Sequence, residues 1–345
     1  MTGRQAGDRN RNAASSVTVV NPLPATLAHY QLEMLSTLGD LGRTAEHPHP
    51  SIEGRSVLGK LAVIFGSLFW RLLRTGKGNT LLVVWPVFGY FDALTWWWAA
   101  RRNTVVLIVH DVTPLRPQFG YSSFAHKAFR FAVRRCRITV VCHTAAAAAE
   151  LQQLTGVVAT LASHPVMASG RSRPQSSSVV RVLGQYKTAR DLTVLAHLGA
   201  KGAPDAGYTW EIHGRGWPAV DGWTTQEGFI EEAAFDTLVS GSACVVIPYT
   251  KFYQSGVIIR CLENLTPVVA VAHPQVDDLF GEDWPGVVRG EDWRAAVERA
   301  TAVPSADRAA ALASARDRAR SEWAAVVGPT NSTSVAGAAG RRDAG

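Results

Sequence analysis

The segment from Ile247 to Pro274 places a polar loop between two apolar, β-branched runs. Within it, Ser255 and Gly256 stand directly before an apolar helical pattern. The start of a helix offers free amide hydrogens and about half a positive charge, so it attracts phosphate. Glycine lets the backbone approach a ligand closely, and serine can either cap the helix or donate to a phosphate oxygen. The segment therefore predicts a phosphate-binding helix start or, as the alternative, an ordinary capped turn.

Two further loops in the same half place cations directly after strand patterns. Tyr186 and Lys187 follow the strand pattern 178–184, and Arg190 comes shortly after them. Arg215 stands between two glycines after the next strand pattern. Lysine is a compact cation that can neutralise a diphosphate without a metal. Three such loops at strand ends predict a phosphate-binding edge, although each cation taken alone could simply be solvated.

In the first half, His110 and Asp111 end an apolar strand pattern. The pair could hydrogen-bond sugar hydroxyls, or the aspartate could orient the imidazole. His143 ends the next strand pattern in the same way. Both histidines are therefore candidates for a site at the strand ends, with a structural role as the alternative for each.

Strand and helix patterns alternate along the chain, which predicts parallel sheets covered by helices on both faces. The expected strands are 16–20, 79–86, 104–111, 137–144, 178–184, 208–214, 242–249 and the run after Pro267. The expected helices include 25–42, 121–136, 145–156, 189–200, 232–241 and the segment after Gly256. Small, basic and polar residues at 166–178 predict a linker between two α/β halves. Because ligands of such sheets bind at the carboxyl ends of the strands, we expect a site in the cleft between the halves.

Composition agrees with a globular protein of two domains, since the chain has 345 residues, 47% of them apolar and 18% charged. The net charge of +7 predicts a basic surface suited to phosphates, nucleic acid or anionic lipid. The four cysteines have neither metal-ligand nor disulfide spacing, so we expect buried thiols in a reducing compartment. The first residues resemble a disordered leader rather than a secretion signal, and no apolar run is long enough to span a membrane.

Four segments together resemble retaining nucleotide-sugar glycosyltransferases of the GT-B fold, in the family 4-like group that includes bacterial mannosyl- and glucosyltransferases. The segment "PYTKFYQSGVIIRCLENLTPVVA" is similar to that family's strand–loop–SGV–helix–PVVA region. "GQYK" is similar to its phosphate loop, "GFIEEAAFDTLVSGSACVVIPY" to the segment that holds the base, and "VHDVTP" to its histidine motif. The resemblance covers roughly residues 16–300.

The resemblance implies an α/β protein with two Rossmann-like domains whose parallel sheets face each other across a cleft. The organisation that follows is a disordered leader (1–15), an N-terminal Rossmann-like acceptor domain (16–165), a linker (166–178), a C-terminal Rossmann-like nucleotide-sugar domain (179–304), a C-terminal helix (305–327) and a disordered tail (328–345).

The same resemblance implies roles for single residues. Catalytic roles would fall on His110, which would contact the donor sugar, and on Lys187, which would bind the donor diphosphate. The donor-binding residues would be Tyr186, Arg190, Arg215, Gly228, Phe229, Ile230, Tyr249, Gln254, Ser255, Gly256, Val257 and Glu263. Among these, the amides of 255–257 would face the phosphates, and 228–230 would line the base pocket. In such enzymes the leaving phosphate itself deprotonates the acceptor, so the resemblance implies no metal, no cofactor and no carboxylate nucleophile.

The chain departs from the family pattern at two positions. Arg260 stands where many members have a ribose-binding glutamate, and Glu263, one turn further on, is a candidate substitute. The arginine usually found before the phosphate-binding lysine is absent, and Arg181, Arg190 or Arg215 could replace it.

We therefore expect a retaining, metal-independent hexosyltransferase of polysaccharide biosynthesis, which moves a hexose from a nucleoside diphosphate sugar to a glycan or polyprenyl-linked acceptor. Because of the two departures, the alternative is a non-catalytic GT-B scaffold or partner of an active glycosyltransferase. The basic residues are scattered rather than interleaved with aromatic residues in one groove, so we expect no nucleic-acid partner.

Residues 56–78 form an amphipathic helical pattern with an aromatic-rich apolar face and basic residues opposite. Such a helix can lie on an anionic bilayer, and Trp96, Trp97 and Trp98 could add interfacial anchors. The alternative is that the apolar face packs against the first sheet. We expect a cytoplasmic protein, with peripheral attachment to the inner face of the plasma membrane under the first alternative.

Overall fold

The computed structural model describes residues 17–22, 27–39, 42–44, 77–84, 86–114, 118–168, 177–200, 207–250 and 252–328, together with the single residues 59 and 66. The expected leader, nearly all of the expected tail, and most of the expected linker and of the segment 56–78 lie outside the described residues.

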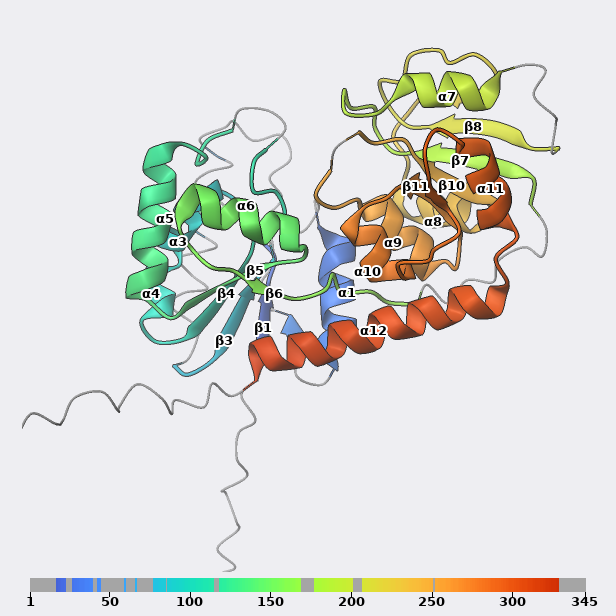
Figure 1. The fold of residues 1–345 in the computed structure, drawn as a ribbon. Helices are drawn as coiled ribbons and strands as arrows, with labels where there is room; N and C mark the ends of the chain where they lie inside the picture. Colours follow the sequence, from blue (N-terminus) through green and yellow to red (C-terminus); the bar gives the residue numbers. More distant parts are fainter. Residues whose placement is uncertain are drawn as a thin grey trace, which may run out of the picture.

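Among the described residues, six parallel strands form the first sheet, in the order β2-β1-β3-β4-β5-β6 (Figure 1). These strands are β1 (Val17–Val20), β2 (Gly42–Thr44), β3 (Thr80–Val83), β4 (Thr104–Ile108), β5 (Ile138–Cys142) and β6 (Thr160–Leu161). The helical segments of this half are α1 (Ala28–Leu38), the 3-10 turn η2 (Gly89–Phe91), α3 (Asp92–Thr95), α4 (Trp97–Ala100), α5 (Ser123–Arg135) and α6 (Ala145–Thr155).

The second sheet is also parallel and contains six of the described strands, in the order β12-β11-β10-β7-β8-β9. These strands are β7 (Val179–Leu183), β8 (Thr209–His213), β9 (Thr224–Gln226), β10 (Cys244–Ile247), β11 (Val268–Val271) and β12 (Val287–Val288). Its helices are α7 (Leu192–Gly199), α8 (Glu232–Ser240), α9 (Gly256–Glu263), α10 (Pro274–Phe280) and α11 (Trp293–Thr301), followed by α12 (Ser305–Val327).

Both faces of the first sheet are buried, as the continuous β-branched runs predict. Leu81 of β3 and its neighbour Leu82 point to opposite faces and belong to two different hydrophobic cores. Phe129 of α5 covers the first of these faces, and Met34 of α1 covers the second. The sheet therefore holds its strand ends rigidly, and the loops that follow them are the parts free to vary.

Side-chain caps fix the starts of three helices that follow strands. Ser122 accepts a hydrogen bond from a backbone amide in the first turn of α5, Thr144 does the same for α6, and Asp191 for α7. Gly156 ends α6 in the left-handed conformation, with a φ of +69°. These local signals explain why most helix starts lie within a few residues of their predicted positions.

The long helix α12 belongs to both halves of the molecule. Leu312 and Ala315 in its first part pack into the core of the second half, whereas Ala319 and Trp323 pack beneath the first sheet. Figure 1 shows α12 running beneath both sheets. The family resemblance implied a helix over 305–327, but its packing against the first half was not expected, and this packing joins the two halves.

Some expectations about the elements were wrong. The helix expected over 25–42 ends at Leu38, because Gly39 takes a positive φ of +54°, and the residues that follow form the edge strand β2. The short strands β6, β9 and β12 were not expected, since two or three residues are too few to show a period. The fully buried thiols of Cys142, Cys244 and Cys261 confirm the expectation of free, buried cysteines at these positions.

Candidate functional site

Three loops meet at the carboxyl edge of the second sheet. The amide of Gly184, at the end of β7, donates to the carbonyl of His213 at the end of β8 (2.9 Å). The amide of Tyr186 donates to the carbonyl of Arg215 (2.9 Å), so the two loops run side by side. A Cβ at Gly184 would lie 4.0 Å from the side chain of Val257, which places the start of α9 against the same loop.

Gly214 is the residue that permits this close approach. Its φ is +147°, and a Cβ there would lie 2.2 Å from the carbonyl oxygen of Gly184. Such contact is closer than packing allows, so a residue without a side chain is required here.

The start of α9 presents its backbone to open space. Gly256 is exposed, and a Cβ built on it would meet nothing within 4 Å. The amides of Gly256 and Val257 belong to the first turn, whose N–H groups have no carbonyl partner within a helix. Ser255 precedes the helix but makes no side-chain cap, so the capping alternative is not realised. Instead, the amide of Ser255 donates to Oε1 of Gln275 (2.8 Å), which holds the turn in place.

Exposed cationic and aromatic side chains lie on the other loops at this edge of the sheet. Lys187 is exposed, and its carbonyl accepts from the amide of Arg190 (2.9 Å), which fixes the loop. Arg215 is also exposed, and its guanidinium lies 5.2 Å from the centre of the Phe229 ring. Phe229 has 67% of its surface exposed and follows Gly228, so an aromatic face is available next to a cation. Ile230 is half-buried beside it.

The side chain of Arg190 does not lie among the exposed cations at this edge of the sheet, where the sequence predicted it. Its side chain is buried, with the guanidinium 4.7 Å from the Trp217 ring and 4.8 Å from the Tyr249 ring. It also donates to the carbonyl at the end of β7 (2.8 Å). Arg181 is committed to an ion pair with Glu211 (2.8 Å). Arg190 and Tyr249 thus form an internal stack behind the loops, and Arg215 is the exposed member of the three candidate arginines.

His110 and Gln254 meet, although they come from different halves of the chain. Nδ1 of His110 lies 3.3 Å from Oε1 of Gln254, and Nε2 lies 2.9 Å from the carbonyl oxygen of Val84. Burial lowers the pKa of His110, so the ring is neutral at pH 7. The sequence placed both residues at one site, and the structure brings them together at the junction between the sheets.

Comparison with known proteins identifies the fold. No protein-family model and no curated protein sequence matches the chain. Solved structures do match: an α,α-trehalose-phosphate synthase (UDP-forming) from Burkholderia vietnamiensis has a TM-score of 0.56 at 12% identity, with 90% of this chain and 98% of that chain covered. The pneumococcal O-GlcNAc transferase GtfA, in complex with UDP and GlcNAc, has a TM-score of 0.53 at 12% identity.

The match to GtfA covers 78% of this chain and 60% of that chain. S. aureus TarM, solved as a mutant with Fondaparinux, α-GlcNAc-glycerol and UDP, has a TM-score of 0.52 at 10% identity and covers 77% of this chain. The chain spans 58% of that TarM structure. This chain has the GT-B fold. The expected α/β architecture of two parallel sheets and the structural resemblance to retaining GT-B glycosyltransferases are thereby confirmed.

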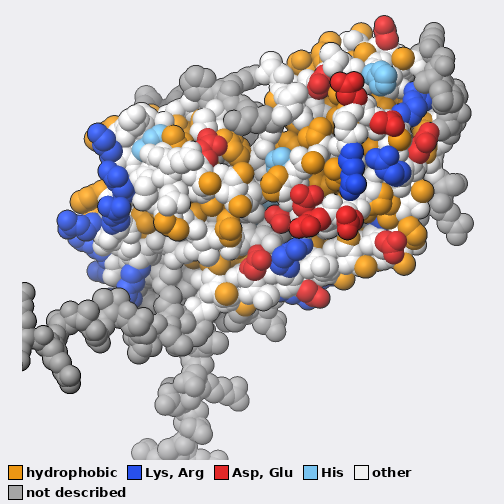
Figure 2. Space-filling view, in the orientation of Figure 1, with side chains coloured by type: hydrophobic (Ala, Val, Ile, Leu, Met, Phe, Trp, Pro, Cys, Tyr) orange, Lys and Arg blue, Asp and Glu red, His pale blue; other side chains and the backbone are white. Residues whose placement is uncertain are grey.

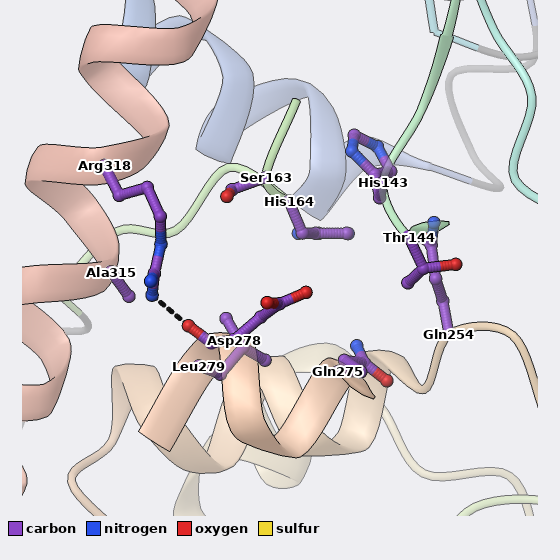
Figure 3. Close-up of a pocket in the computed structure, with 10 residues that line it drawn as sticks. All are labelled: His143, Thr144, Ser163, His164, Gln254, Gln275, Asp278, Leu279, Ala315 and Arg318. Atoms are coloured by element: carbon purple, nitrogen blue, oxygen red, sulfur yellow. Dashed lines mark hydrogen bonds between the residues drawn. The ribbon is translucent and has the colours of Figure 1, made fainter. Parts of the chain in front are cut away.

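The two halves of this GT-B fold touch around a small cavity with room for about one water molecule (Figure 3). It is lined by His143, Thr144, Ser163, His164, Gln254, Gln275, Asp278, Leu279, Ala315 and Arg318. His143 has a structural role here, because Nε2 accepts from the Tyr30 hydroxyl (2.9 Å) and Nδ1 lies 2.7 Å from the Ala162 carbonyl. Most of the other lining residues come from loops and helix faces that carry no motif, so no sequence pattern points to them.

The α9 helix of the GT-B fold also carries Arg260 and Glu263, the residues of the departure from the family pattern at the ribose-binding position. Arg260 is buried and pairs with Asp236 (2.6 Å) and Glu232 (2.7 Å) on α8. Glu263 is buried and lies 2.6 Å from Nε2 of His29 in the first half. Its contact with a ribose stays a prediction, and its carboxylate in this structure faces α1.

Proposed function

We propose that the chain is a retaining, metal-independent glycosyltransferase that moves a hexose from a nucleoside diphosphate sugar to a glycan or lipid-linked acceptor. The observation that carries the proposal is the open backbone at Gly256, next to Val257, whose side chain lies against Gly184 of the loop that carries Lys187. Amides at a helix start and an ammonium group on the neighbouring loop are groups that bind a diphosphate.

In this proposal, catalysis rests on charge stabilisation rather than on a nucleophilic side chain. As the bond to the sugar breaks, negative charge develops on the leaving diphosphate, and oriented amides and cations lower the energy of that charge. The amides of Gly256 and Val257 and the ammonium of Lys187 would do this. A diphosphate oxygen would then accept the proton of the attacking acceptor hydroxyl. His110 would contact the donor sugar from the first domain.

The base of the donor would lie against the loop from 228 to 230. Phe229 offers an exposed ring on which a base can stack, and Arg215 lies next to that ring. We propose uridine as the first base to test, because TarM and GtfA were solved with UDP and the Burkholderia synthase forms it.

A thermal-shift screen with UDP, GDP and ADP tests donor binding. A ligand present at a hundred times its dissociation constant should stabilise the protein by about 2.7 kcal/mol. Lys187→Ala removes a charged contact and should weaken nucleotide binding at least about tenfold. Lys77→Ala, which removes an exposed lysine of the first domain, is the matched control and should bind like the parent. Stabilisation by none of the nucleotides, or equal binding by both variants, would contradict the proposal.

A non-catalytic GT-B scaffold is the second candidate, and one observation favours it. Arg260, at the position of the family's ribose-binding glutamate, forms ion pairs with two carboxylates of α8. Glu263, the candidate substitute, is already engaged with His29. Incubation with UDP-sugars separates the two candidates, because an active enzyme releases UDP by transfer or slow hydrolysis, and Lys187→Ala abolishes that release. Nucleotide binding without any turnover would support the scaffold.

We also propose that the first domain contacts an anionic membrane, as a lipid-linked acceptor would require. The evidence is a stripe on the outer face of α5, where Phe124, Lys127, Phe131 and Arg135 lie on one side. Phe124 is 72% exposed and Phe131 is 50% exposed. Figure 2 shows Lys and Arg gathered at this edge of the domain. Exposed aromatic residues flanked by cations suit an anionic interface.

Neighbouring helices extend this surface. Trp98 is 64% exposed, whereas Trp96 is fully buried, so Trp98 is the exposed anchor of the expected trio. Asp111 is the single acidic residue in the sequence from 93 to 137, so little opposes the basic charge. No helix within the described parts of the chain is long and apolar enough to cross a membrane.

Flotation with vesicles of anionic phospholipid tests the contact. The double variant Phe124→Glu/Phe131→Glu should lose most of its binding, because it removes apolar contacts and introduces like charge. Phe229→Glu, at an equally exposed phenylalanine of the second domain, is the matched control. If the double variant floats with the vesicles as well as the parent does, this surface is not the contact.

A further inference from the structure

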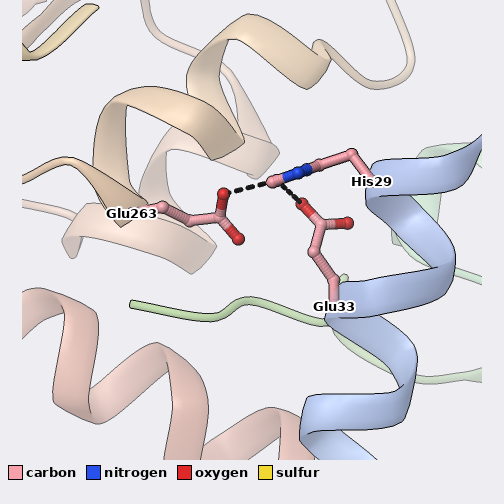
Figure 4. A group of neighbouring side chains, drawn as sticks. All are labelled: His29, Glu33 and Glu263. Atoms are coloured by element: carbon pink, nitrogen blue, oxygen red, sulfur yellow. Dashed lines mark hydrogen bonds and ion pairs between the residues drawn. The ribbon is translucent and has the colours of Figure 1, made fainter. Parts of the chain in front are cut away.

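A cluster of one imidazole and two carboxylates joins the two domains (Figure 4). His29 and Glu33 lie four residues apart on α1, so they share one face of that helix. Glu263 comes from the end of α9, 234 residues from His29. Nε2 of His29 lies 2.6 Å from one Glu263 oxygen and 3.1 Å from one Glu33 oxygen. All three groups can place a ligand atom within 4.8 Å of the others.

Burial makes this cluster unusual. The side chains of Glu33 and Glu263 are 2% and 1% exposed, while that of His29 is 19% exposed and forms the edge toward solvent. Carboxylates lose hydration on burial and need close positive charge in return. Burial raises the pKa of Glu33 to about 8, despite its bond to His29. Burial would lower the pKa of His29, but its bonds to Glu263 and Glu33 raise it to about 9.

We propose that His29, Glu33 and Glu263 bind one divalent transition-metal ion of the Zn²⁺ type, which fastens the first domain to the second. Imidazole and carboxylate are ligands that Zn²⁺ accepts at about 2.0–2.2 Å. In tetrahedral geometry such ligands lie about 3.4 Å apart. The observed separations of 2.6 and 3.1 Å therefore need to widen by less than about 1 Å to admit the ion.

Charge balance explains how an ion can replace the existing contacts. A divalent cation bound by one neutral imidazole and two carboxylates gives a cluster with no net charge. The bound cluster therefore leaves no net charge buried, and the 19% exposed side chain of His29 lies at its edge toward solvent.

Further contacts hold the ligands in place. The amide of Met167 donates to the second oxygen of Glu263 (2.9 Å), which orients that carboxylate. Nδ1 of His164 lies 3.8 Å from the second oxygen of Glu33, but it is hydrogen-bonded to the Pro165 carbonyl (2.7 Å) and so does not orient that carboxylate. The ion would lie at the opposite end of α9 from Gly256, so it would act on domain arrangement and not on the donor phosphates. The inference is separate from the proposed phosphate contacts, but it gives Glu263 a role other than the predicted contact with a ribose.

Titration of the metal-stripped full-length protein with Zn²⁺ alone tests the site. We expect one ion bound per chain, with protons released on binding. Glu33→Gln and Glu263→Gln keep the shape of the cluster but each remove an anionic ligand, so each should weaken binding at least about tenfold. Glu322→Gln, which changes a carboxylate that accepts from the amide of Ser163 at the same domain junction, should bind like the parent.

Two outcomes would overturn the proposal: no stoichiometric Zn²⁺ binding, or binding that Glu33→Gln and Glu263→Gln leave unchanged. Circular dichroism without metal shows whether these variants fold. If either fails to fold, X-ray absorption of the Zn²⁺-loaded parent decides the matter, because this site predicts nitrogen and oxygen ligands with one imidazole. Sulfur ligands would assign the ion to the cysteines instead.

Discussion

Replacing Trp323 by alanine tests whether α12 is part of the core of the first domain. The Trp323 side chain is fully buried and packs in one cluster with Val17 and Met34. Its Nε1–H donates to the carbonyl of Ser163 (3.0 Å). A buried tryptophan replaced by alanine costs about 3–5 kcal/mol through lost contacts and the cavity left behind. The orphaned carbonyl adds about 1 kcal/mol. We therefore expect the first domain to lose at least about 4 kcal/mol of stability.

Native-state hydrogen exchange measures this loss domain by domain, because it reports the free energy of local opening. Amides of β1 and α1 should exchange faster in Trp323→Ala, while those of β8 in the second sheet should change little. Trp98→Ala is the matched control, since Trp98 is 64% exposed, and it should cost within about 0.5 kcal/mol. A loss below about 1 kcal/mol, or one confined to the second sheet, would refute the docking of α12 on the first core.

Three further predictions concern single contacts. Gly214→Ala would bring a Cβ within 2.2 Å of the Gly184 carbonyl oxygen, so thermal melting should show a loss of about 2 kcal/mol or more and calorimetry should show weaker nucleotide binding. Asp236→Asn should lower the free energy of unfolding, measured with urea, more than Glu232→Gln does. Both residues pair with the buried Arg260, but Asp236 is 19% exposed and Glu232 is 70% exposed, and an exposed pair contributes at most about 1 kcal/mol. Burial raises the pKa of Asp92 to about 7, so the folded chain keeps a proton that the unfolded chain releases above about pH 4, and this residue lowers stability as pH rises from about 4 to about 7. Asp92→Asn should therefore reduce the fall in melting temperature across that window, and an unchanged pH profile would contradict this assignment.

The fold could be predicted largely because its central strands are buried on both faces. Runs such as 104–108 and 244–247 are apolar and β-branched along most of their length, which is typical of strands in a parallel sheet. Several of the helices between such strands also have side-chain caps. The edge strand β2 could not be predicted, since three residues with one β-branched side chain show no period. The docking of α12 was also hidden, because alanine occupies both buried positions such as Ala315 and Ala319 and exposed ones such as Ala313, so the sequence shows no distinct apolar stripe.

The sequence could predict which loops form the candidate site, because the position of a loop in the fold follows from the strand order. It could not predict which way each side chain of these loops points. Loops at the carboxyl ends of parallel strands must lie at one edge, which brings Gly184, Arg215 and Gly256 together. Arg190 lies on one of these loops, but its guanidinium packs against the rings of Trp217 and Tyr249, which come from other loops. The spacing of His29 and Glu33 is visible in the sequence, whereas their contact with a residue of the other domain depends on how the two halves pack.

The segment from Tyr253 to Glu263 carries several contacts between the two domains. Tyr253 donates to Glu150, Gln254 lies against His110, and Glu263 contacts His29. The same segment contains Gly256, whose open backbone faces the proposed phosphate site. The helix α9 is about 12 Å long and joins the two ends of this segment. Any separation of the domains must therefore break contacts at both ends of this segment.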